Sequence, residues 1–184
     1  MKISKQALGL IPMRLLGAIF AMVSFPVLAQ DPEIVEEVVA AAEPLVFKGD
    51  VAWMMTATLL VTFMAIPGLA LFYGGLVRTK NMLSMLMQVT AVFCLIVVLW
   101  AIYGYSLALT EGNAIIGGMS QLFLGQTTID STAGTFTDGI VLPETIFIAF
   151  QSTFAGLTCA LIVGSMAERA KFAGVLLFAV IWFT

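Results

Sequence analysis

Three phenylalanines recur at helical spacing in one apolar stretch of the sequence. Phe147, Phe150 and Phe154 are three and four residues apart, so an α-helix places them on one side. A ring face attracts a bare cation within about 6 Å, by roughly 2 kcal/mol when the cation is desolvated. Rings can also close a channel as an apolar constriction. The chemistry that this spacing allows is therefore cation binding or gating.

Polar side chains crowd the same turns: Gln151, Ser152, Thr153 and Thr158. Polar groups at membrane depth usually line protein interior or a water-accessible path. We therefore expect Gln151 and Thr158 to support a pore wall beside the rings. The alternative for the rings is contact with lipid or with a neighbouring helix, and their spacing alone does not decide between the two.

Small residues recur every four positions along the same stretch: Ser152, Gly156, Ala160 and Gly164. Such a ladder lets a second helix approach closely enough for backbone packing. Phe154 is two positions, or about 200°, from Ser152 on a helix. We therefore predict a packing seam on one face of this helix and the phenylalanines on another.

Residue types for other chemistry are scarce. Histidine, the commonest general base and metal ligand, does not occur. Cys94 and Cys159 lie in apolar runs, where a thiol behaves as a small buried hydrophobe. Glu168 is expected to pair with Arg169, Lys171 or a helix end, which supports topology rather than catalysis. We therefore expect no enzyme, no metal site and no cofactor.

The composition is that of a membrane protein. Of the 184 residues, 61% are hydrophobic and 10% are charged, against roughly 25% charged residues in soluble domains. The mean hydropathy is +1.07. A net charge of -3 without a basic stripe argues against nucleic acid as a partner. The lipid bilayer is the expected surrounding of this chain.

Long uncharged runs predict membrane-spanning helices. Residues 51–77, 81–109 and 145–167 carry no charge, and at about 1.5 Å per residue each is longer than a hydrocarbon core of about 30 Å. A fourth run, residues 172–184, reaches only about 20 Å and is expected to stop in mid-membrane. The predicted fold class is all-α: a polytopic transmembrane helical bundle, with three complete helices and part of a fourth.

Individual residues mark the ends and irregularities of these helices. Pro67 lacks a backbone N–H and predicts a kink in the first span. Gly74 and Gly75 are expected to end that helix, since glycine tolerates a left-handed C-terminal cap. Asn81 suits the cap of the second helix and Pro143 the start of the third. The tryptophans are expected to pack against other helices: Trp53, Trp100 and Trp182.

The N-terminus has the pattern of a signal peptide. Basic residues precede a short apolar run at 15–23, and small residues at 27–29 suit a signal peptidase. We predict a cleavable signal peptide over residues 1–29, with an uncleaved first membrane helix as the alternative. In residues 30–50, Lys48 is the only basic residue among several acids, which predicts a solvated acidic leader.

Basic residues predict the orientation of the chain. Four of them lie in the two tight turns between spans: Arg78, Lys80, Arg169 and Lys171. By the positive-inside rule these turns are cytoplasmic. The acidic leader and the glycine-rich loop, residues 110–142, are then external. The mature N-terminus is therefore expected outside the cytoplasm.

Four motifs in this sequence resemble the signatures of the ammonium transporter family. They occur in the family's order and at its intervals: residues 68–78 with 80–85, 103–107, 149–155 and 164–169. In the family they form the first-to-second-helix signature, the end of the second helix, the third-helix pore segment and a cytoplasmic turn. The resemblance covers about residues 50–184 and is most specific to bacterial members with a cleaved signal peptide. It implies a multi-pass protein of the bacterial inner membrane.

The resemblance implies transport of ammonium. Family members have eleven helices, assemble as homotrimers and carry one narrow hydrophobic pore in each protomer. Ammonium binds at an external aromatic site, gives up its proton and crosses as ammonia past stacked phenylalanines. Phe150 matches a ring of the capture site and Phe154 matches the outer gate. The resemblance also implies a PII-type signalling protein as a partner on the cytoplasmic side.

The chain departs from the family pattern by what it lacks. The remaining capture-site residues, the inner gate, the paired pore histidines and a structural aspartate lie on later helices and have no counterpart here. We therefore expect residues 1–184 alone neither to transport nor to trimerise normally. An ammonium sensor with the same pore fold is the alternative function, and a long soluble signalling domain after the last helix would favour it.

Overall fold

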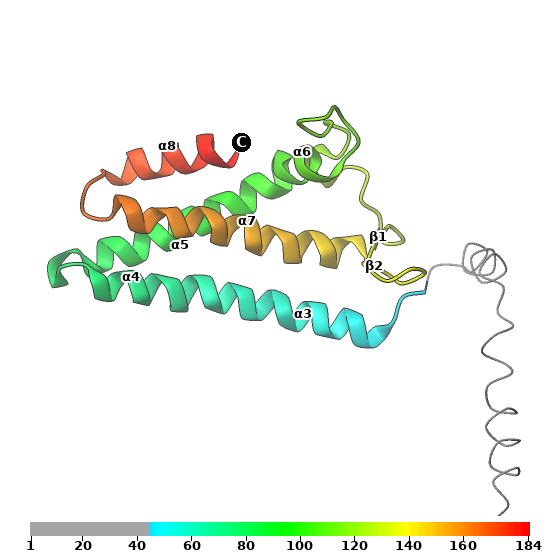
Figure 1. Cartoon of the computed structure of the whole chain (residues 1–184), viewed down its shortest axis with the longest axis horizontal. Helices are drawn as coiled ribbons and strands as arrows, with labels where there is room; N and C mark the ends of the chain where they lie inside the picture. Colours follow the sequence, from blue (N-terminus) through cyan, green and yellow to red (C-terminus); the bar gives the residue numbers. More distant parts are fainter. Residues whose placement is uncertain (1–44) are drawn as a thin grey trace, which may run out of the picture. The chain divides into compact units, whose positions relative to one another are not determined.

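The structure, a computed structural model, describes residues 45–184 and is dominated by apolar helices (Figure 1). Three of them are long and apolar enough to cross a membrane: Lys48–Leu76, Thr79–Leu109 and Glu144–Met166. The predicted all-α class, a polytopic helical bundle, is confirmed. The predicted signal peptide, residues 1–29, and residues 30–44 of the predicted leader lie outside the described part of the chain.

The first span is one composite helix. Its segments are α3 (Lys48–Phe63), the π-helical turn η1 (Met64–Leu69) and α4 (Ala70–Leu76). Pro67 lies inside η1, and because proline cannot donate a hydrogen bond, the backbone ladder widens around it. The helix ends at Leu76, before the extended residue Val77, and not at the glycines. Gly74 instead allows close packing, since a Cβ there would lie 2.5 Å from Leu86 Cδ1.

The second span is also composite. It begins with the 3-10 turn η2 (Thr79–Asn81) and continues as α5 (Met82–Leu99), the π-helical segment η3 (Trp100–Gly104) and α6 (Tyr105–Leu109). The sequence gives no proline or other sign of the π-helical segment. Gly104 within it faces the last turn of α8 (Phe172–Phe183), because a Cβ there would lie 2.5 Å from Phe183 Cζ.

The loop between the second and third spans holds a short antiparallel hairpin. Its strands are β1 (Thr132–Gly134) and β2 (Val141–Pro143), with Ala133 opposite Leu142. β2 leads directly into α7 (Glu144–Met166). The Glu144 amide donates to the Ser131 carbonyl oxygen over 2.9 Å. The hairpin therefore anchors the start of α7.

The buried core surrounds α5, which packs against α7, α4 and α8 (Figure 1). Most of its buried members are small or branched apolar residues: Ala70, Met85, Val89, Val92, Ile96, Cys159, Ala160, Val163, Val175 and Ala179. α7 also contacts α3, and the first span, α5 and α7 share a small buried cluster of Ala65, Phe93 and Leu157. Because α7 contacts both α3 and α5, its rotation about its own axis is set by these two neighbours.

Candidate functional site

The phenylalanines of α7 separate into a pair and a single ring. Phe150 and Phe154 contact each other edge to face, with ring centroids 5.0 Å apart and planes at 65°. Phe154 is 40% exposed. Phe147 instead packs against a buried cluster that contains Trp100 and Tyr105. Of the three phenylalanines, Phe154 is therefore the most exposed, and its ring contacts that of the half-buried Phe150.

The hydroxyl groups near the pair are bonded to their own helix. Ser152 Oγ donates to the Ala149 carbonyl oxygen over 2.7 Å, and Thr153 Oγ1 donates to that of Phe150 over 2.6 Å. Such bonds satisfy hydroxyl groups inside an apolar region without water. Two of the polar side chains that cluster here in the sequence, Ser152 and Thr153, are therefore satisfied by the carbonyl groups of their own helix.

The two residues expected to line a path lie beside the pair. Thr158 is exposed, and its Oγ1 donates to the Phe154 carbonyl oxygen over 2.7 Å. Gln151 is half-buried. Both residues belong to the turns of α7 that carry the rings, and the hydrogen bond of Thr158 joins it directly to the backbone of Phe154.

The small residues of α7 lie against α5 and α4. Ala160 is fully buried and Ser152 is buried. A Cβ on Gly156 would lie 2.9 Å from Phe93 Cδ2, and a Cβ on Gly164 would lie 2.6 Å from Tyr73 Cζ. The absence of a side chain at Gly156 and Gly164 therefore leaves room for the rings of Phe93 and Tyr73, which a larger residue would displace.

One carboxylate joins the two basic turns. Glu168 Oε1 accepts from the Arg78 backbone N–H over 3.0 Å and from Asn81 Nδ2 over 2.8 Å. Glu168 Oε2 lies 3.8 Å from Arg78 Nε. We call this region, with its basic residues Arg78, Lys80, Arg169 and Lys171, the basic end of the bundle.

Of the partners expected for Glu168 from the sequence, the structure shows the helix end, because Arg78 and Asn81 are the N-cap residues of η2 and α5. Glu168 bonds to the other turn and not to Arg169 or Lys171, and the Asn81 side chain bonds to Glu168 instead of capping α5. The Asn81 amide, then the Arg78 backbone N–H, lower the pKa of the Glu168 carboxyl from its ordinary value. The cause is that both donors stabilise the charged form.

A second carboxylate is buried at the opposite end of α7. Glu144 Oε1 accepts a 2.6 Å hydrogen bond from the Tyr105 hydroxyl, and the Tyr105 ring contacts Trp100 with centroids 6.1 Å apart. Glu144 is 8% exposed. The sequence marks Pro143 as a helix start but gives no sign that the next residue pairs with a tyrosine 39 positions away.

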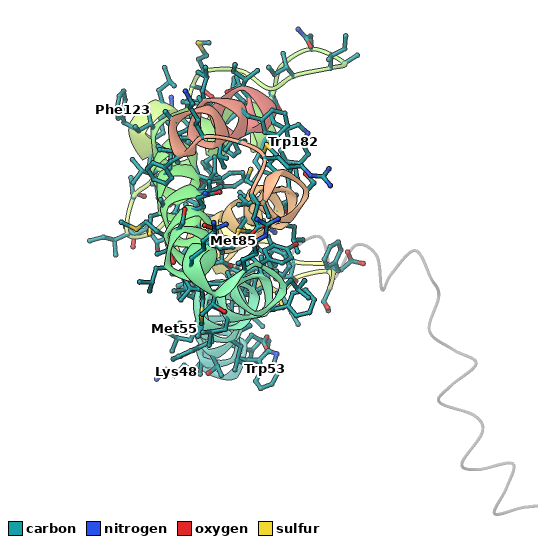
Figure 2. All side chains as sticks on the ribbon, turned by 90° about the vertical axis from the view of Figure 1, so that its left-hand side faces the viewer. Lys48, Trp53, Met55, Met85, Phe123 and Trp182 are labelled. Atoms are coloured by element: carbon teal, nitrogen blue, oxygen red, sulfur yellow. The ribbon has the colours of Figure 1, made fainter. Side chains whose placement is uncertain are left out.

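The cysteines and tryptophans singled out in the sequence do not form a common site in the structure, and neither do possible metal ligands among residues 45–184. Among residues 45–184 no group of three His, Cys, Asp or Glu side chains could hold a metal ion. Cys159 is buried as expected, whereas Cys94 is exposed. Trp100 packs in the core, but Trp53 and Trp182 lie at the outer surface of the described helices (Figure 2). An apolar bundle in lipid exposes such side chains to acyl chains or to further helices.

The chain matches one protein family along most of its length. Residues 52–184 match the Ammonium Transporter Family. An ammonium transporter of Bacillus subtilis (strain 168) is 43% identical over 134 residues, which cover 73% of this chain and 32% of that protein. An ammonium transporter of Mycobacterium tuberculosis (strain ATCC 25618 / H37Rv) is 43% identical over 149 residues, which cover 74% of this chain and 31% of that protein.

Solved structures give the same result for the fold. A Mep2 mutant from Candida albicans superposes with a TM-score of 0.61 at 27% identity, over 74% of this chain and 30% of that one. Mep2 from Saccharomyces cerevisiae gives 0.56 at 29% identity, over 73% of this chain and 29% of that one. The chain spans about a third of the length of the curated relatives it matches. It is a multi-pass membrane protein and belongs to the ammonium transporter family.

Proposed function

We propose that the protein moves ammonium across the membrane, with Phe150 and Phe154 on the path. Relatives at 43% identity are ammonium transporters. The observation that carries the proposal is the edge-to-face pair of rings, which remains partly exposed although the helix around it is packed. A solvent-facing or path-facing ring pair is available to a cation, whereas a ring in the core is not.

The two rings have different proposed roles: Phe150 binds the ammonium ion, and Phe154 controls the passage of ammonia. A ring face offsets part of the cost of removing water from ammonium, so Phe150 serves the capture of the ion. A charged ion in hydrocarbon is costly, whereas neutral ammonia crosses cheaply once the proton is lost. Phe154, one turn from Phe150, then acts as an apolar gate. Potassium carries no proton to lose, so the same barrier rejects it. Gln151 and Thr158 support the wall beside the rings.

The proposed orientation follows from charge. The basic end lies in the cytoplasm by the positive-inside rule. The hairpin end of α7, with the buried pair of Tyr105 and Glu144, is then external, and so is the mature N-terminus. The membrane is the bacterial inner membrane, and residues 1–29 are a signal peptide that directs the chain to it.

The proposed assembly and partner come from the family. The protein forms a homotrimer of eleven-helix protomers, of which the described helices are the first. A PII-type signalling protein binds on the cytoplasmic side. The basic end is the part of the described chain that this partner would meet, because its two turns carry four basic residues.

Uptake by a strain without ammonium transporters tests the function. The full product of the gene should restore growth on limiting ammonium and the initial rate of ammonium uptake. A sensor with the same fold would change the cell's response to ammonium without restoring uptake. Absence of uptake from correctly inserted protein would contradict the proposal and favour the sensor.

A further inference from the structure

A polar recess lies at the basic end, between the two turns and the start of α5. It has a volume of about 210 Å³, and its polar lining comes from Asn81, Ser84, Gln88 and Glu168. Gln88 is six residues past the first residue of α5, or about 9 Å along the helix axis. The recess therefore connects a surface carboxylate with a polar side chain that lies well inside an apolar helix.

The Gln88 side chain is half satisfied. The residue is 7% exposed. Its Nε2 donates to Ser84 Oγ over 3.3 Å, and its Oε1 has no hydrogen-bond partner among residues 45–184. Turning the amide by 180° would exchange the two atoms and leave an N–H group unpaired in place of the carbonyl. In either orientation one polar atom requires a partner, because burial of an unpaired polar group is costly.

We infer that the recess binds ordered water, with Gln88 as its buried ligand. Water both donates and accepts, so it satisfies Gln88 in either orientation of the amide. The volume of about 210 Å³ far exceeds the roughly 10–15 Å³ that one water needs. A buried water makes about two to four hydrogen bonds. The other polar side chains of the lining, Asn81, Ser84 and Glu168, supply the further partners that it needs.

The charges around the recess favour water over a cation. Glu168 already accepts two hydrogen bonds through Oε1, and its other oxygen lies 3.8 Å from Arg78 Nε. Lys80 lies in the same turn as Arg78. A second cation would be repelled by these groups, whereas a neutral water is not.

A structure of the wild-type protein that resolves ordered solvent tests this directly. The expected result is a water oxygen within about 3.2 Å of the Gln88 side-chain amide. The Gln88→Leu variant replaces the amide by an apolar side chain and should lose that water while α5 keeps its place. A dry recess, with both ends of the Gln88 amide bonded to protein atoms, would overturn the inference.

Thiol reactivity gives a second, independent test. The thiolate is the reactive form of cysteine and requires contact with water. In membranes containing the protein with Cys94 and Cys159 replaced by serine, Gln88→Cys should react with a maleimide at least about tenfold faster than Val92→Cys. Val92 is the matched control because it lies one turn farther along the same face and is fully buried. Equal, slow alkylation of both variants would contradict a hydrated recess.

Discussion

Gly156 of α7 lies so close to Phe93 of α5 that a Cβ on the glycine would be 2.9 Å from the ring and 3.2 Å from the Phe93 carbonyl oxygen. The contact determines which face of α7 is turned toward α5. Phe154 is two positions away, about 200° around the helix, so its ring is turned away from this seam. Packing at one small residue thereby orients the proposed aromatic path.

A methyl group at this contact should destabilise the bundle. Gly156→Ala forces the Phe93 ring or backbone to move, and overpacking of this kind costs about 1–3 kcal/mol. Gly174→Ala in α8 is the matched control, because a Cβ there meets nothing within 4 Å and alanine favours helix by up to about 1 kcal/mol. Unfolding in detergent, followed by circular dichroism, measures both. A Gly156→Ala variant as stable as Gly174→Ala would show that the seam is loose.

Removing the Tyr105 hydroxyl should leave a buried carboxyl group without its donor. The bond to Glu144 is 2.6 Å long, and leaving a buried polar group without its partner costs about 1–3 kcal/mol. Tyr105→Phe is therefore expected to lower the free energy of unfolding by about this amount. Tyr103→Phe, which removes an exposed bond to Thr184, should cost less. A double-mutant cycle with Glu144→Gln isolates the pair, and a coupling energy near zero would refute it.

Acid should release the contact between the two basic turns. The pKa of Glu168 is lowered in the folded protein, first by the Asn81 amide and then by the Arg78 backbone N–H. Its contribution to stability is therefore complete above the ordinary carboxyl pKa and is lost as the pH falls through the lowered value. Glu168→Gln cannot titrate and should abolish this part of the pH dependence. Thermal unfolding between neutral and acidic pH measures the difference, and identical profiles for the two proteins would count against it.

The spans were predictable because the signals for them are local. Uncharged runs mark the three long helices, and Pro67 marks the irregular turn η1. The spacing of Phe150 and Phe154 predicts rings on one side of a helix, and the structure has them in contact. Each of these features depends on residues within a few turns of one another, which periodicity describes directly.

The polar contacts were not predictable because they join distant parts of the chain. Glu168 and Asn81 are 87 positions apart, and only the packing of α7 beside α5 brings their turns together. Gln88 has a local bond to Ser84, but its unpaired atom is apparent only once neighbouring helices bury it. No sequence spacing encodes either relationship, since both follow from tertiary packing.

The central claim is that ammonium passes by the ring pair, and uptake by a variant without both rings tests it most directly. The protein with Phe150→Ala and Phe154→Ala, expressed from the full gene in a strain without ammonium transporters, should take up limiting ammonium at least about tenfold more slowly than wild type, because one desolvated cation–ring contact contributes roughly 2 kcal/mol. Phe63→Ala, which removes an exposed ring from α3, should leave uptake unchanged. Wild-type uptake by the double variant, at equal amounts in the membrane, would contradict the account.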